Sequence, residues 1–218
     1  MSKNLKIVNC GKNWIKFGSR VIKKDLLKKA KNSHVILTGG RYAKKIYTNK
    51  VFKKLNHNNK IILSDERITN VQKFKNSNIL KKYFKLTKIL EPNELQNTKR
   101  YIISFCLLSL GEDGHFASIF PGDRKTIFSK KKYFEYSSKK YKNFKRISIS
   151  LEFLSKIKKI YILVNGDKKG HELNKIIKFY KYSKIFNKKL ILKYPLLKIL
   201  SKCIFLLDNK AFKKVGNL

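Results

Sequence analysis

The strongest candidate for chemistry in this 218-residue sequence is His115, which follows Gly111, Glu112, Asp113 and Gly114. Two glycines allow a tight turn that can hold an imidazole ring against a substrate. Histidine exchanges protons near neutral pH, and Asp113 can orient the ring or stabilise its protonated form. We therefore predict that His115 is a general base supported by Asp113. The other histidines, His34, His57 and His171, have no comparable setting, and we expect structural or solvent-exposed roles for them.

Two further segments carry groups that can bind an anion. Gly39-Gly40 precedes an expected helix, so that backbone amides there can approach an anion, and Arg41 adds a charged donor. Asp65-Glu66-Arg67 places carboxylates beside a guanidinium. Neither segment is specific alone, because Gly-Gly also makes ordinary turns and such charges are more often solvated or cap a helix. The polar residues 76–78 are expected to cap a helix.

Apolar runs that are typical of strands alternate with helical patterns. A helix is expected over residues 12–31, with others after residue 40 and after Gly166. Buried strands are expected at residues 34–38, 60–64, 102–110, 159–165 and 203–207, and an exposed or edge strand at 146–150. This alternation predicts an α/β fold with a mostly parallel, doubly wound sheet. In open α/β sheets, ligands bind beyond the carboxyl ends of the strands, so these polar segments and Asn165-Gly166 should meet at one edge.

The net charge of +40 raises the possibility of a nucleic-acid partner. Only six of the 53 basic residues are arginine, the residue that nucleic-acid surfaces use for bidentate contacts. The lysines are spread through every segment, together with abundant Asn and Ile, and all three residues have A/T-rich codons. We therefore attribute the charge to base composition and predict no specific nucleic-acid partner. A broadly positive field should still attract a phosphorylated substrate.

The length fits one α/β domain over residues 1–218, with room for a small peripheral lobe. No apolar run approaches the roughly 20 residues of a membrane span, and the first residues lack the apolar stretch of a secretory signal. We predict a cytoplasmic protein without a membrane partner, with a monomer favoured. Cys10, Cys106 and Cys203 have no spacing that suggests zinc or a disulfide framework, and the last two should pack as small apolar groups.

The order of the motifs resembles the 6-phosphogluconolactonase family. The resemblance runs from about residue 12 to residue 211, and its most specific parts are the segments 113–122 and 64–67. It implies a Rossmann-like fold with helices on both faces of the sheet and metal-free, cofactor-free hydrolysis of 6-phospho-glucono-1,5-lactone. The segments that carry it are Leu37-Thr38-Gly39-Gly40-Arg41, Ser64-Asp65-Glu66-Arg67, Ser77-Asn78, Asp113-Gly114-His115-Phe116-Ala117-Ser118-Ile119-Phe120-Pro121-Gly122, Arg146-Ile147-Ser148 and Gly166-Asp167-Lys168-Lys169.

The resemblance also implies roles for individual residues. His115 would activate the water that attacks the lactone carbonyl, Asp113 would support it, and Asp65 would help to set the geometry or protonation of the site. The candidates for holding phosphate and sugar oxygens are Gly39, Gly40, Arg41, Arg67, Arg146 and Lys169. The chain departs from the family at Arg41-Tyr42-Ala43, where a small hydroxyl residue and a proline are usual, and in a shorter segment over residues 79–101.

Three alternatives stay open at this point. A glucosamine-6-phosphate deaminase also has a loop with Asp-Gly-His, but that loop runs toward Asn-Glu-Pro, whereas this one runs Ser118-Ile119-Phe120-Pro121. That family also usually has an aromatic residue at the position of Arg67. A basic nucleic-acid-binding protein on a retired enzyme scaffold is an alternative of a different class. Tyr42 and the short segment 79–101 motivate the third, an inactive homologue.

Overall fold

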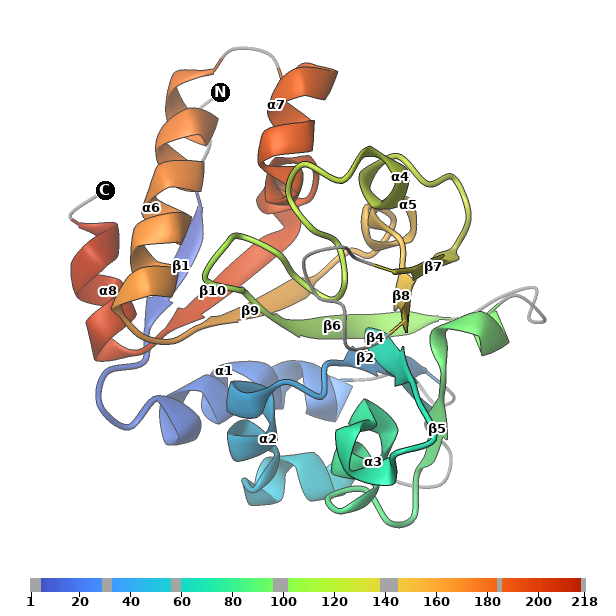
Figure 1. The fold of residues 1–218 in the computed structure, drawn as a ribbon. Helices are drawn as coiled ribbons and strands as arrows, with labels where there is room; N and C mark the ends of the chain where they lie inside the picture. Colours follow the sequence, from blue (N-terminus) through green and yellow to red (C-terminus); the bar gives the residue numbers. More distant parts are fainter. Residues whose placement is uncertain are drawn as a thin grey trace.

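The computed structural model describes residues 5–28, 33–55, 60–95, 102–137, 145–183 and 186–216, except for the side chains of Leu27, Lys28, Arg41 and Lys54. Within these ranges, seven strands form one sheet in which every neighbouring pair is parallel (Figure 1). Their spatial order is β1 (Lys6–Asn9), β10 (Cys203–Leu207), β9 (Ile160–Val164), β6 (Ile103–Ser109), β2 (His34–Leu37), β3 (Lys60–Leu63) and β5 (Lys88–Leu90). The predicted α/β fold with a mostly parallel sheet is confirmed.

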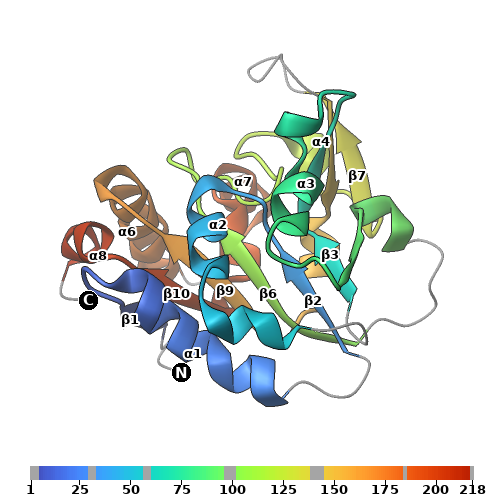
Figure 2. The same ribbon diagram turned by 90° about the horizontal axis from the view of Figure 1, so that it is seen from below.

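Helices cover both faces of this sheet. On one face lie α1 (Trp14–Lys28), α2 (Arg41–Tyr47) and α3 (Asn76–Lys81), and on the other lie α6 (Asp167–Tyr182), α7 (Lys188–Lys193) and α8 (Asn209–Val215) (Figures 1 and 2). Short helices connect the elements: α4 (Arg124–Ile127), α5 (Leu151–Leu154) and the 3-10 helices η1 (Lys50–Lys54), η2 (Gln72–Phe74), η3 (Pro92–Leu95), η4 (Pro195–Lys198) and η5 (Leu200–Lys202). None of the helices in the described ranges is long and apolar enough to cross a membrane.

Apolar side chains from successive positions of the central strands fill two separate cores. Ile36 packs in the core beneath α6, whereas Val35 and Leu37 pack in the core beneath α1 and α2. Because both faces are buried, the strands appear as continuous apolar runs instead of alternating patterns. All three cysteines are buried, and Cys106 and Cys203 pack in the larger core as predicted.

The chain leaves the middle of the sheet in two directions. From β2 it proceeds outward through β3 to β5, and from β6 it proceeds the other way through β9 to β10. The neighbouring strands β2 and β6 therefore flank a topological switch point, which is where α/β sheets form a ligand crevice at their carboxyl ends.

A second sheet corrects two sequence predictions. It contains β4 (Asp65–Ile68), β8 (Lys145–Ile149) and β7 (Tyr133–Tyr136), all antiparallel. The charged segment 65–67, for which solvated charges or a helix cap were the ordinary expectation, is part of a strand, and Asp65 and Glu66 are buried. The prediction of an exposed or edge strand at 146–150 is also wrong, because β8 is the central strand and its last three residues are buried. Ser148 tolerates burial because its hydroxyl accepts a hydrogen bond of 3.1 Å from the Ser118 amide.

Candidate active site at the switch point of the sheet

A cleft of about 400 Å³ lies at the carboxyl ends of β2 and β6. Residues after β2 and residues after β6 line two of its walls, and the small sheet and α6 contribute cationic side chains. The lining residues are Thr38, Gly40, Tyr42, Asp65, Arg67, Asn76, Ser109, Leu110, Gly111, Glu112, His115, Ala117, Arg146 and Lys169. The switch point thus brings together three of the four polar segments that the sequence predicted to meet, whereas Asn165-Gly166 does not line the cleft.

His115 forms a close pair with Asp113. The Asp113 Oδ1 atom lies 2.5 Å from His115 Nδ1, and both side chains are about one-third exposed. An ionised carboxylate can only accept a hydrogen bond, so this contact places the proton on Nδ1 and leaves Nε2 as the proton acceptor. The pair has the arrangement that orients a histidine base in hydrolases.

Aromatic stacking fixes the plane of the imidazole ring. The His115 ring lies 4.9 Å from the Phe120 ring at an interplanar angle of 31°, and Phe120 stacks in turn on Tyr136 at 5.4 Å. The loop closes with a hydrogen bond of 2.7 Å from the Gly111 amide to the His115 carbonyl. Ring stacking and loop closure together limit the positions that His115 can adopt.

Gly111 leaves the space that the His115 ring occupies. A Cβ atom at this position would lie 2.1 Å from His115 Nδ1 and 2.8 Å from Asp113 Oδ1. We expect Gly111→Ala to displace the imidazole ring. For a reaction in which His115 is the base, this should lower kcat by about 100-fold, since a displacement of about 1 Å in a catalytic group costs this much. Steady-state kinetics measures the loss, and circular dichroism checks the fold. An Ala variant with wild-type kcat would show that the base does not need this ring position.

Arg67 and Arg146 lie directly opposite each other on β4 and β8. Directly paired residues of an antiparallel sheet point to the same face, and like charges in such a pair repel each other. Both residues line the cleft. Two guanidinium groups on one face suit a doubly charged oxyanion such as a phosphate, since each can donate two parallel hydrogen bonds.

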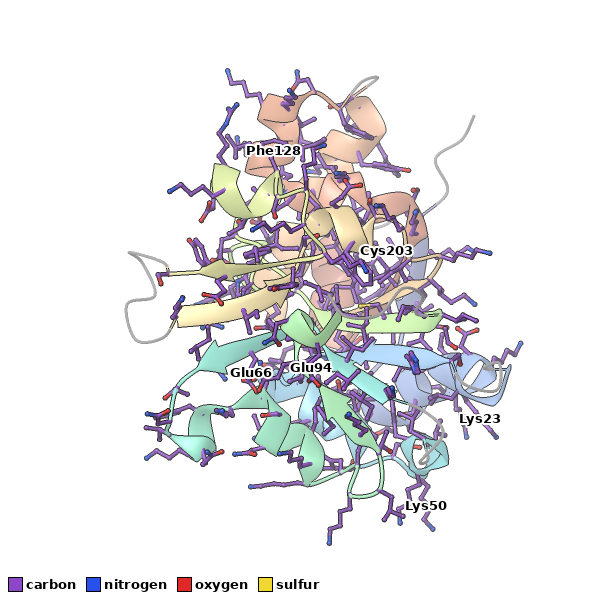
Figure 3. The ribbon with its side chains drawn as sticks, turned by 90° about the vertical axis from the view of Figure 1, so that its right-hand side faces the viewer. Lys23, Lys50, Glu66, Glu94, Phe128 and Cys203 are labelled. Carbon is purple, nitrogen blue, oxygen red and sulfur yellow. The ribbon has the colours of Figure 1, made fainter. Side chains whose placement is uncertain are left out.

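Asn76 and Glu66 hold the strand and the side chain of Arg67. Arg67 Nη1 donates to the Phe74 carbonyl at 2.7 Å and to Asn76 Oδ1 at 3.1 Å. The buried Glu66 lies where β4 meets α3 (Figure 3). Its carboxylate accepts from the backbone amides of Arg67, Asn76 and Ser77, each at 2.7 Å. The position of the guanidinium is therefore tied to the first turn of α3.

Asp65 connects three parts of the site. Its carboxylate accepts hydrogen bonds from the hydroxyls of Ser64 at 2.8 Å and Ser118 at 3.1 Å, and it forms an ion pair with Arg146 at 3.7 Å. Because Ser118 belongs to the loop that carries His115, Asp65 joins that loop to the small sheet. It is 5% exposed, which suits a residue that sets geometry more than one that exchanges protons with water.

Six of the nine residues predicted from the sequence line the cleft, and the other three differ in position. Asp113 lies behind His115, in contact with Nδ1. Gly39 does not line the cleft; a Cβ there would lie 2.5 Å from the Asn76 side chain, so glycine makes room for that amide. The side chain of Arg41 lies outside the described residues. The six are Asp65, Gly40, Arg67, Arg146, Lys169 and His115.

Sequence reasoning missed the role of Asn76 and had no place for Tyr42 in the site. Asn76 was expected to cap a helix; instead its side chain donates to the Asp65 carbonyl at 2.9 Å and accepts from Arg67. The pattern of polar residues at 76–78 contains no signal for this role, because its partners Arg67 and Asp65 lie nine and eleven positions earlier in the chain. Tyr42 was identified only as a departure from a family pattern.

Fold and cleft define the chain as an α/β protein with a candidate ligand site at the switch point of a parallel sheet. Its structure is similar to a 6-phosphogluconolactonase from Trypanosoma cruzi, with a TM-score of 0.78, 16% identity and coverage of 100% of this chain and 99% of the other. A 6-phosphogluconolactonase from Plasmodium vivax is also similar, with a TM-score of 0.75, 17% identity and coverage of 99% and 94%. At these identities the similarity supports the fold alone.

Sequence comparison identifies the family. A family model described as glucosamine-6-phosphate isomerases/6-phosphogluconolactonase matches residues 77–185, half of the chain. A 6-phosphogluconolactonase of Borreliella burgdorferi is 31% identical over 162 residues, which are 73% of this chain and 67% of that protein. This chain belongs to the glucosamine-6-phosphate isomerase/6-phosphogluconolactonase family. The resemblance seen in the sequence is confirmed.

Proposed function

We propose that this chain hydrolyses 6-phospho-D-glucono-1,5-lactone to 6-phospho-D-gluconate. The observation that carries the proposal is one cleft that holds both an oriented His115–Asp113 pair and two arginines facing each other across a strand pair. The histidine–aspartate pair is suited to activating water, and the two arginines are suited to binding a phosphate. The name of the Borreliella burgdorferi relative supports the same activity.

In the proposed reaction, His115 acts first as a base. Its Nε2 atom accepts a proton from a water molecule as the water oxygen attacks the lactone carbonyl carbon. The imidazolium then stands beside Asp113, which stabilises the positive charge. Collapse of the tetrahedral intermediate breaks the bond from the carbonyl carbon to the ring oxygen, and the ring oxygen takes the proton from the imidazolium. The product carboxylic acid ionises at neutral pH.

The cationic side chains bind and orient the substrate in this proposal. Arg67 and Arg146 hold the phosphate, and Lys169 holds a further anionic or carbonyl oxygen. Gly40 lets the substrate approach the backbone after β2. The proposed steps use no metal or organic cofactor, and we therefore expect an unchanged rate in the presence of EDTA.

Hydrolysis of freshly prepared 6-phosphogluconolactone, followed by proton release, tests the proposal directly. The expected result is a rate that rises in proportion to the concentration of the protein above the spontaneous rate. A rate equal to the spontaneous one would refute it. In a parallel assay with glucosamine 6-phosphate, release of ammonia without lactone hydrolysis would identify the deaminase alternative.

The remaining sequence predictions are separate from this assay. A monomeric state, a cytoplasmic location and the lack of a specific nucleic-acid partner stay predictions. The nucleic-acid alternative predicts sequence-dependent binding at physiological salt, whereas scattered lysines predict only weak binding that disappears as salt is added.

A further inference from the structure

The structure gives Tyr42 a place in the cleft. Tyr42 is the second residue of α2 and is half-buried, with its ring edge-on to Trp14 at 6.3 Å. It also lines the cleft. The ring is therefore held by α1 on one side and faces the site from the β2 side.

The ammonium group of Lys169 lies over the Tyr42 ring, 4.8 Å from its centroid. The same Nζ atom donates to the Ser109 hydroxyl at 3.4 Å. An aromatic face attracts a cation at this distance through its quadrupole. Tyr42 follows β2 and Ser109 ends β6, so the two contacts come from two different strands. Together they fix the ammonium end of the Lys169 side chain, which would otherwise sample many rotamers.

The position of Lys169 in α6 makes this support necessary. Lys169 is the third residue of a 16-residue helix, where the positive end of the helix dipole disfavours a cation. The contacts with the Tyr42 ring and the Ser109 hydroxyl offset this unfavourable interaction and hold the ammonium group at the cleft.

We propose that Tyr42 is a positioning residue that holds the Lys169 ammonium over the cleft, where it meets the anionic group of the substrate. The proposal deepens the proposed function and rests on it for the identity of that substrate. The ring thus explains why a bulky residue at this position is compatible with an anion site.

Variants of Tyr42 separate the ring from the hydroxyl. Tyr42→Leu removes the aromatic face and is expected to raise the KM for 6-phosphogluconolactone by about 3- to 30-fold, with kcat changed by less than about 2-fold. Tyr42→Phe keeps the face and should return KM toward the wild-type value. A merely structural role would affect Leu and Phe variants through stability and kcat, not through KM alone.

A double-mutant cycle with Lys169→Met tests whether Tyr42 acts through this lysine. If it does, Tyr42→Leu has no further effect on KM once Lys169 is replaced. The matched control is Lys45→Met, because the Lys45 ammonium lies over the same ring at 5.9 Å but is exposed and does not line the cleft. Additive effects of the two substitutions would overturn the proposal.

Binding of 6-phosphogluconate, measured by calorimetry, tests the positioning role of Tyr42 independently of lactonase activity. Weaker binding by Tyr42→Leu, restored in Tyr42→Phe, would support the positioning role even in a chain without lactonase activity. Unchanged binding and an unchanged KM in Tyr42→Leu, in a chain that hydrolyses the lactone, would refute the positioning role and leave the proposed function intact.

Discussion

Replacing His115 with glutamine is expected to lower kcat for lactone hydrolysis by about 10²- to 10⁴-fold, the usual contribution of a positioned general base. Glutamine retains a polar side chain of similar length but cannot accept a proton from water near neutral pH. The imidazole is paired with Asp113 and lies against the buried Phe120 ring, so its loss removes the base together with one aromatic contact of the loop. Steady-state kinetics with fresh lactone measures the effect.

His171 provides the matched control for this experiment. It is an exposed histidine on α6 that does not line the cleft, so His171→Gln should keep the wild-type kcat. The fold of both variants can be compared by thermal unfolding. A His115→Gln variant that retains full kcat would refute the proposed mechanism, even if the wild-type chain proves to be a lactonase.

Replacing Arg67 with methionine is expected to lower kcat/KM for the phosphorylated lactone on the order of 10- to 100-fold. The substitution removes a guanidinium group that donates charge-assisted hydrogen bonds to the phosphate of the ligand. The effect should be much smaller for glucono-1,5-lactone, which lacks the phosphate. Arg67→Lys should recover only part of the loss, because an ammonium group lacks the planar fork that binds two phosphate oxygens. The ratio of kcat/KM values for the two lactones is the decisive measurement.

Arg20 serves as the control arginine. It is exposed on α1, with its guanidinium 5.4 Å from the Phe17 ring, and it does not line the cleft. Arg20→Met should therefore leave both values of kcat/KM near those of the wild type. Equal losses for the two lactones in Arg67→Met would contradict a phosphate-binding role and would indicate a general effect on the site.

The sequence predicted the parallel sheet well because its central strands are buried on both faces. Five apolar runs correspond to β2, β3, β6, β9 and β10. The two strands that were missed, β1 and β5, lie at the edges of this sheet and have only four and three residues. Short edge strands bury little apolar surface, so they leave only a weak apolar pattern.

The second sheet was not predicted because its polar residues are buried in hydrogen bonds. Asp65, Glu66 and Ser148 are all nearly inaccessible, although such residues usually indicate solvent. Their partners, such as Ser118 and the amides of α3, come from distant parts of the chain. Local patterns therefore identified the residues of the site, whereas the long-range hydrogen bonds that position them became visible only in the folded chain.

The order of strands has a consequence for how this family can vary in size. β5 lies at one margin of the sheet, with β3 and β2 between it and β6. Trimming or extending that margin does not displace β6, the strand that precedes the His115 loop. Insertions and deletions among relatives should therefore gather beyond β3, while the distance from β2 to β6 stays constant.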